Sequence, residues 1–365
     1  MSRPRWARWV TRISLVVALA ALALTIRDIG PRNIGHYLQR IGWWWFAVVA
    51  LEITITSLDA VAIHSFLSPE QHLTRLRTVV LAQLAGRSVN AVTPSGNLGE
   101  AVKISVLTED VSNSRAVATI LLYNVVSFTA EFGFVAVAAP IAAVLVPMPA
   151  WTQYTLLVIG AVSLVIAIGL YALVRRGMLT SVARAALKIH VLSPARYTRW
   201  EQKLRAVDDK LRLVAGARRR DRMIGIGAVL ASRATSYSLS LLVLHAVGEP
   251  LTLAFVAAYI VGSHAIYLVS SLVPMGLGIS EGGNYWLFKA LGENPARGVT
   301  LVIARRVTLV MYAALGLVLF AASETVRRAR DRQRVPAAEP APAPAAPIAM
   351  PLPTAAVVQI RDVAE

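Results

Sequence analysis

The chain has 365 residues, of which 56% are hydrophobic and 16% are charged, and its mean hydropathy is +0.59. Because soluble domains carry roughly 25% charged residues, this composition excludes a soluble multi-domain protein. The net charge of +17 does not indicate nucleic-acid binding, since the arginines cluster between apolar stretches, as in cytoplasmic loops of membrane proteins. The absence of cysteine excludes disulfides and cysteine metal sites.

The first apolar stretch, at about residues 9–27, follows a basic segment and resembles a signal peptide. No small-residue cleavage site follows it, so we expect an uncleaved membrane helix with a cytoplasmic N-terminus. A second helix is expected at about residues 42–66, with tryptophans near its start at the outer interface. Two further helices are expected at about residues 116–146 and 152–174.

The stretch at residues 77–108 does not fit a simple membrane crossing. It contains the sequence VTPSGNLGEAVK, in which Pro94, Gly96 and Gly99 disfavour a continuous helix. Residues 175–222 carry 14 Lys or Arg and 4 Asp or Glu, and should therefore lie in the cytoplasm. If the membrane crossings are counted back from this basic loop, residues 77–108 must enter and leave on the cytoplasmic side. This predicts a re-entrant hairpin.

The second half of the chain repeats this pattern. Residues 223–247 and 299–325 are expected to cross the membrane, and residues 251–292 begin and end outside. The breaker residues of this stretch are Pro274, Gly276 and Gly278. Its Pro-x-Gly motif lies 180 positions after the first one, and the flanking helices have a similar offset. Two chance motifs are one explanation, but the agreement favours an inverted repeat whose broken helices meet near the midplane.

These elements predict an all-α polytopic transmembrane bundle with two re-entrant hairpins. The transmembrane domain is expected at residues 1–325, with half one at about 41–174, the basic loop at 175–222 and half two at 223–325. Residues 326–365 are rich in Pro and Ala and are expected to form a disordered tail. We expect a multi-pass protein of the cytoplasmic (inner) membrane with both termini in the cytoplasm.

Charged residues inside apolar segments are the candidates for a binding site, because a charge near the bilayer centre is costly. The candidate substrate-binding residues are Arg305, Arg306, Arg233, Glu281, Glu100, Lys103, Glu52 and Asp59. Further polar candidates in the hairpins are Arg87, His264 and Lys289. In the functional interpretation, arginines hold a lipid phosphate and helix N-termini at the glycine-rich tips add N–H donors. In the alternative interpretation the charges join helices, with Glu52 pairing to Arg233.

The two hairpin glutamates differ in local sequence. Asn97 and Glu100 have the spacing of a capping box, so a cap and a substrate contact are both open to Glu100. Glu281 lacks this pattern, since Gly283 follows Ser280 at the third position, and a substrate or proton-coupling role is favoured for it. The hairpin glycines are expected to permit tight turns and close helix approach; they are Gly96, Gly99, Gly276, Gly278, Gly282 and Gly283.

Three stretches carry a resemblance: TPSGNLGEAVKISVL, VPMGLGISEGGNYWLFKALG and IARRVTLVMYAALGLVLF. They resemble the flippase-like integral membrane family named after the transmembrane part of lysylphosphatidylglycerol synthase, over about residues 10–325, and the second is similar to its hopanoid-associated subgroup. The resemblance implies a polytopic protein that moves lipids or lipid-linked molecules between leaflets. We do not expect the soluble synthase domain that some members carry. Many members have an arginine where this chain has Tyr123 and Asn124. Recognition of the headgroup is therefore expected to differ between the two halves of this chain.

The leading hypothesis is a lipid translocator that moves an anionic phospholipid or an isoprenoid-type lipid. No ATP-binding motif is present, so movement should be passive or coupled to an ion gradient. One alternative is a membrane-embedded enzyme that modifies a lipid headgroup, with Glu100, Glu281 or Asp59 as acid or base. Another is an envelope assembly factor recruited through the basic loop and tail. We expect no metal site, since the histidines are scattered, and no catalytic residue or cofactor, since no nucleophile elbow, phosphate loop or dinucleotide fingerprint appears. We expect no nucleic-acid partner.

Overall fold

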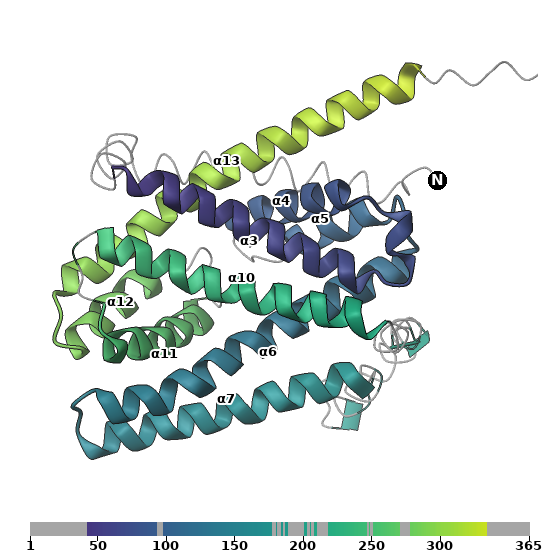
Figure 1. The fold of residues 1–365 in the computed structure, drawn as a ribbon. Coiled ribbons are helices and arrows are strands. Elements are labelled where there is room, and N and C mark those ends of the chain that lie inside the picture. Colours follow the sequence, from purple (N-terminus) through teal and green to yellow (C-terminus); the bar gives the residue numbers. More distant parts are fainter. Residues whose placement is uncertain are drawn as a thin grey trace, which may run out of the picture. The chain divides into compact units, whose positions relative to one another are not determined.

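A computed structural model describes residues 42–92, 98–176, 218–246, 248, 251–270 and 278–333, with scattered positions between 180 and 209. The main elements in this part are α3 (Trp44–Phe66), η1 (Glu70–Leu73), α4 (Leu76–Val92), α5 (Leu98–Leu107), α6 (Asn113–Leu145), α7 (Ala150–Arg176), α10 (Arg219–Ala246), α11 (Leu253–Ser270), α12 (Ile279–Ala290) and α13 (Pro295–Gln333). All are helical, and the prediction of an all-α fold is confirmed (Figure 1).

Several predicted features lie outside the described residues. They are the helix at 9–27, the tip residues Pro94, Gly96, Asn97, Pro274 and Gly276, and the tail beyond residue 333. The chain divides into two compact units, Met1–Phe320 and Ala321–Glu365, and α13 runs across their boundary. The contacts between the helices from α3 to α12, and those of α13 up to Phe320, belong to the first unit.

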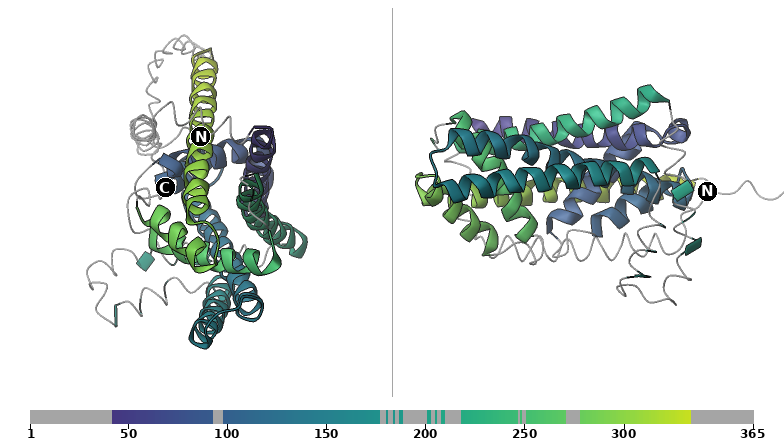
Figure 2. Two further views of the ribbon diagram at one scale, coloured as in Figure 1. Left: turned by 90° about the vertical axis from the view of Figure 1, so that its left-hand side faces the viewer. Right: turned by 90° about the horizontal axis from the view of Figure 1, so that it is seen from below.

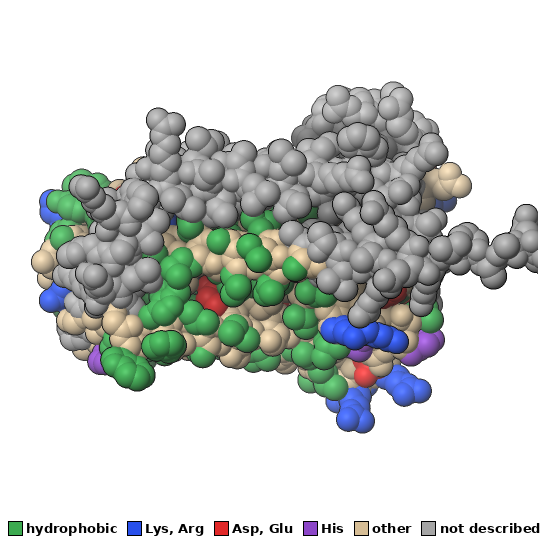
Figure 3. Space-filling model, turned by 90° about the horizontal axis from the view of Figure 1, so that it is seen from above, with side chains coloured by type: hydrophobic (Ala, Val, Ile, Leu, Met, Phe, Trp, Pro, Cys, Tyr) green, Lys and Arg blue, Asp and Glu red, His purple; other side chains and the backbone are tan. Residues whose placement is uncertain are grey.

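Six helices are long and apolar enough to cross a membrane. The candidate spans are Trp44–Phe66, Asn113–Leu145, Ala150–Ala172, Arg219–Ala246, Leu253–Ser270 and Pro295–Leu319. Their outward faces carry large exposed hydrophobic side chains, among them Val158 and Val165 of α7, which are 61% and 69% exposed. Figure 3 shows hydrophobic side chains across the middle of one face, with Lys, Arg and His toward its ends. Such surfaces are rare on soluble monomers, and this is a multi-pass membrane protein.

The long helices form two packed pairs. α6 and α7 lie side by side, joined by the short connection that contains Pro147 and Pro149, which ends α6 because proline lacks an N–H donor (Figure 1). α3 packs along α10, although the two helices are far apart in sequence. At its start α6 is capped by Ser112, whose hydroxyl accepts a hydrogen bond from the N–H of Arg115.

Four successive helices recur in each half of the chain at a nearly constant offset. The helices α3, α4, α5 and α6 begin at Trp44, Leu76, Leu98 and Asn113, and α10, α11, α12 and α13 begin at Arg219, Leu253, Ile279 and Pro295. When the helices are paired in this order, each helix of the second half begins nearly the same number of residues after its counterpart in the first half. The interval between Pro94 and Pro274 of the two Pro-x-Gly motifs agrees with that of the helices.

The two halves are interleaved reciprocally. In one apolar cluster α4 and α5 meet α13 of the other half; its members are Ala82, Ala85, Val89, Val102, Val106, Val310, Ala313 and Leu317. In the matching arrangement, α11 packs on α6 of the first half, where Val261 meets Val135, Ala138 and Ala139. The equivalent helices α3 and α10 pack on each other. Reciprocal contacts of this kind are those that a pseudo-twofold relation produces.

The short helices lie at opposite ends of the α3–α10 pair. α4 and α5 lie toward the end where α3 finishes, and α11 and α12 lie toward the end where α10 finishes (Figures 1 and 2). This placement agrees with an inverted repeat. α11 has the length and hydropathy of a membrane span by itself, so the re-entrant course of the two short pairs stays a prediction.

Glycines allow the short helices to approach each other. A Cβ at Gly99 of α5 would collide with the carbonyl oxygen of Gly86 in α4 and with the Asn90 side chain. The expected close approach is not found at Gly282, where an added Cβ would meet nothing within 4 Å. In the other pair, a Cβ at Gly283 would lie 2.8 Å from Ile266. Gly278 has φ of 78°, a conformation that residues other than glycine rarely adopt.

Candidate functional site

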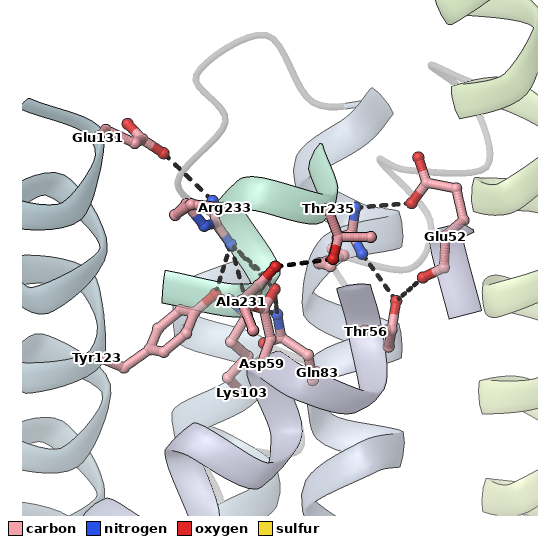
Figure 4. A network of polar contacts seen from close by, with 12 residues as sticks. Glu52, Thr56, Asp59, Gln83, Lys103, Tyr123, Glu131, Ala231, Arg233 and Thr235 are labelled. Atoms are coloured by element: carbon pink, nitrogen blue, oxygen red, sulfur yellow. Dashed lines mark hydrogen bonds and ion pairs between the residues drawn. The ribbon is translucent and has the colours of Figure 1, made fainter. Parts of the chain in front are cut away.

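Asp59 is the centre of a buried polar cluster between α3, α4 and α10 (Figure 4). The residue is 1% exposed. Gln83 Nε2 donates to Asp59 Oδ2 at 2.9 Å, and Ser232 Oγ donates to Oδ1 at 2.6 Å. Arg233 Nη2 donates to both carboxylate oxygens, at 3.0 and 3.3 Å. Asp59 thus has donors from both halves of the chain, which satisfy a charge that would otherwise be costly to bury.

Arg233 also connects Asp59 to the long helix α6. Its Nη1 donates to Glu131 Oε1 at 3.2 Å, and its Nη2 lies 3.4 Å from the hydroxyl of Tyr123. Figure 4 shows Arg233 between these groups, with Glu131 on the side away from Asp59. One guanidinium is therefore shared by two carboxylates, Asp59 and Glu131.

Glu52 belongs to a second cluster on the same helix. Its Oε2 accepts from Arg87 Nη2 at 2.9 Å, and Arg87 Nη1 donates to Thr56 Oγ1 at 2.8 Å. The guanidinium of Arg87 also lies 5.0 Å from the centre of the Tyr312 ring. The pairing of Glu52 with Arg233, which the alternative interpretation offered, is therefore wrong. Two turns of helix separate Glu52 and Asp59 by about 10 Å, so an arginine level with Asp59 does not reach Glu52.

Glu100 is the anion of the third cluster, at the start of α5. It accepts from Lys103 Nζ at 2.9 Å, from Asn90 Nδ2 at 3.1 Å and from Asn124 Nδ2 at 3.2 Å. Lys103 is 3% exposed and its ammonium lies 5.3 Å from the ring of Tyr123. The charge of Lys103 is thus matched within the α4–α5 pair.

Glu281 forms the equivalent cluster at the start of α12. It is ion-paired to Arg306 of α13, and its Oε2 accepts from the N–H of Gly278 at 2.9 Å. The expectation that Glu281 has no capping role is wrong, because α12 begins after Gly278 and places Glu281 at the third helical position. Arg306 Nη2 is buried without a hydrogen-bond partner among the described residues. Arg305 is exposed on the same helix.

The third and fourth clusters occupy equivalent positions in the two halves. Glu281 follows Glu100, and Arg306 follows Asn124, by nearly the interval that relates the two Pro-x-Gly motifs. In each half, a glutamate in the first turn of the short helix contacts the long helix that follows. In the first half this partner is the neutral amide of Asn124, and in the second half it is the guanidinium of Arg306. A cation of the long helix therefore contacts the glutamate in the second half and not in the first.

The clusters lie within a region with a recognisable sequence. Residues 12–316 match the family described as the lysylphosphatidylglycerol synthase TM region. The chain belongs to this family. Membership indicates a membrane protein of lipid metabolism or transport. Comparisons with curated proteins and with solved structures gave no significant match.

Two charged residues of the clusters and helix ends, the half-buried Glu131 and the buried Arg115, were missed in the sequence. Glu131 lies in the apolar stretch SFTAEFGFVAV, and the argument that selected Asp59 applies equally to it. Arg115 is fully buried, and its Nη2 donates to the carbonyl oxygens of Phe66 and Ser68 where α3 ends. Arg115 thus satisfies carbonyl groups that the helix itself leaves unpaired.

The remaining polar candidates lie outside the four clusters. His264 packs edge-on against Phe132 with ring centres 5.1 Å apart, and Lys289 lies 4.7 Å from the ring centre of Trp286 on the exposed side of α12. Within the described ranges, no group of three or more His, Asp or Glu side chains is placed to hold a metal ion.

Proposed function

We propose that this protein moves a phospholipid or an isoprenoid-type lipid between the leaflets of the cytoplasmic membrane without hydrolysing ATP. Family membership supports a role with lipids, and the interleaved repeat supports transport, because alternating exposure of a central site is typical of transporters with inverted repeats. The proposed partners are membrane lipids rather than nucleic acid.

The observation that carries the proposal is the Glu281–Arg306 pair and its counterpart at Glu100. Arg306 and Glu281 are 22% and 26% exposed, so a headgroup can reach them. Arg306 Nη2 is itself buried and has no partner within the described part of the chain, so a phosphate reaches it only when it takes the place of Glu281. A guanidinium binds two oxygens of one phosphate well. In the proposed mechanism, a lipid phosphate replaces the Glu281 carboxylate on Arg306 while the acyl or isoprenoid chains remain in the bilayer.

The distribution of arginines supports an orientation for this transport. α3 ends and α10 begins at the same end of the bundle, where the basic residues Arg75, Arg77, Arg218, Arg219, Arg220 and Arg222 lie (Figure 1). The positive-inside rule assigns this end to the cytoplasm. The Glu100 cluster then faces the cytoplasmic side and the Glu281 cluster faces the opposite side.

The test is lipid exchange in liposomes that contain the full chain. Labelled anionic, zwitterionic and isoprenoid lipids are placed in one leaflet, and their appearance in the other leaflet is followed. We expect faster exchange than in empty liposomes for at least one lipid, and slower exchange with Arg306→Gln. The matched control is Arg77→Gln, which neutralises an exposed arginine outside the clusters.

Two results would contradict the proposal. One is exchange of all three lipid classes at the rate of empty liposomes. The other is a chemically altered lipid in the mass spectrum after incubation, which would indicate a headgroup-modifying enzyme instead.

A further inference from the structure

The charges of the four clusters do not balance in the same way. Glu52 is matched by Arg87, Glu100 by Lys103 and Glu281 by Arg306, each as one carboxylate with one cation. The cluster of Asp59, Arg233 and Glu131 has two carboxylates and one guanidinium. All three of its members lie in the middle part of candidate membrane spans. Within the part of the chain that the structure describes, one negative charge is thus uncompensated, in a region where an unpaired charge is strongly disfavoured.

The two carboxylates of this cluster are held differently. Asp59 is 1% exposed and accepts hydrogen bonds from Gln83, Ser232 and Arg233, so both of its carboxylate oxygens have donors. Glu131 is bound through Oε1 to Arg233, and its Oε2 is buried without a partner in the described part of the chain. The open position for a neutralising proton is therefore Oε2 of Glu131.

Among the described residues, the other helices around this cluster do not supply the missing positive charge. Arg87 of α4 interacts with Asp59, but its ion pair is with Glu52. Their charged and titratable groups nearest this region are Arg233 and Tyr237 of α10, His264 and Tyr267 of α11, Asp59 of α3, and Glu100 and Lys103 of α5. α7 has no Asp, Glu, Lys, Arg or His between Ala150 and Ala172, and its tyrosines are Tyr154 and Tyr171. Arg305 of α13 lies near Tyr237. In the described ranges, the cation that forms an ion pair with Glu131 is Arg233.

We propose that Glu131 is a proton-binding site that couples lipid movement to a proton gradient, an inference that rests on the proposed transport. Protonation forms an O–H bond at Oε2 with a proton taken from water on one side of the membrane. Release returns that proton to water on the other side and leaves a carboxylate whose charge draws Arg233 away from Asp59. Because Asp59 and Arg233 join the two halves, the protonation state of Glu131 sets the strength of their contact.

A proton fits this site better than a metal cation. Glu131 offers one open carboxylate oxygen, and in the described ranges no group of three acidic or histidine side chains is placed around it. Alkaline-earth cations bind through several oxygens at once. A proton needs only the single oxygen that is open.

The first experiment detects the proton without any transport. Infrared spectra of the purified full chain at neutral pH should contain the carbonyl band of a protonated carboxyl group. We expect Glu131→Gln to remove the band and Glu131→Asp to shift it, since the aspartate carboxyl has a different environment. A wild-type spectrum without the band, or a band unchanged by both substitutions, would overturn the proton site.

The second experiment measures coupling in the liposomes described above. We expect a gradient of one pH unit to drive up to about tenfold asymmetry of the lipid between leaflets if one proton moves per lipid. In Glu131→Gln, which keeps the shape of the side chain, exchange should be equal with and without the gradient. Wild-type exchange that ignores the pH gradient, or follows a sodium gradient instead, would overturn the coupling. Absence of exchange for every lipid would overturn the proposed transport, while the infrared result still decides the proton site.

Discussion

Arg306 of α13 is ion-paired to Glu281 in the first turn of α12. The same glutamate also accepts a hydrogen bond from the N–H of Gly278, so it joins the start of a short helix to a long neighbouring helix. This contact ties the helix geometry of the second half to the guanidinium that we assign to the headgroup. The energy of the Glu281–Arg306 contact and the role of Arg306 in transport can therefore be separated by experiment.

We predict a modest coupling energy between these two residues. Both are partly exposed, and polar contacts between membrane helices contribute about 0.6–2 kcal/mol. A double-mutant cycle with Arg306→Gln, Glu281→Gln and both together, read by thermal unfolding in detergent, measures this value. Lipid exchange should fall in every variant that lacks Arg306, including the double variant. A double variant with wild-type exchange would show that Arg306 has only a structural role.

Asp59→Ala should be among the most destabilising substitutions in the chain. It leaves the buried side chains of Gln83 and Ser232 without their shared acceptor, while Arg233 keeps Glu131. Each buried donor left without an acceptor costs about 1–3 kcal/mol. The matched control on the same helix is Thr54→Ala, since Thr54 is exposed and its hydroxyl donates to the carbonyl of Ala50 one turn away. We expect the control to stay within about 0.5 kcal/mol of the wild type. Equal unfolding temperatures for the two variants would contradict the assigned cluster.

Gly99→Ala should separate α4 from α5. The added Cβ meets backbone and an amide side chain that cannot move away easily, so we expect a loss of about 1–3 kcal/mol. Gly282→Ala in α12 is the control, because a Cβ there meets nothing within 4 Å and alanine favours a helix by up to about 1 kcal/mol. Thermal unfolding of both variants should give changes of opposite sign.

The re-entrant course of the short helices can be tested by cysteine labelling, since the natural chain has no cysteine. Arg77→Cys and Glu109→Cys place thiols at the two ends of the α4–α5 pair. Both should react with an impermeant reagent from the cytoplasmic side in oriented vesicles. Leu251→Cys and Glu293→Cys, which flank α11 and α12, should both react from the other side. Labelling of one pair from opposite sides would show a full crossing instead of a hairpin.

Helix content and helix order were predictable because they depend on local properties. Apolar runs of about 20 residues identify membrane helices, and Pro and Gly mark where helices break, so the segments around α3, α6, α7, α10 and α13 were located to within several residues. The repeat was also visible, since the recurrence of the Pro-x-Gly motif of Pro94 at Pro274 is a property of the sequence alone. The capping role of Glu281 was missed because the capped residue is a glycine, which has no side chain to complete the usual pattern.

The sequence by itself determined which charges lie within apolar helices, because the apolar runs are read directly from it. It did not determine their burial, since the candidate Arg305 is exposed and the overlooked Arg115 is fully buried. It did not determine their partners: Glu52 contacts Arg87, while Arg233 lies between Asp59 and Glu131. Partner choice depends on which residues of packed helices reach the same depth, and helix crossing and rotation set that depth. Only the tertiary structure therefore decided that three clusters are balanced and that the one at Glu131 has an excess carboxylate.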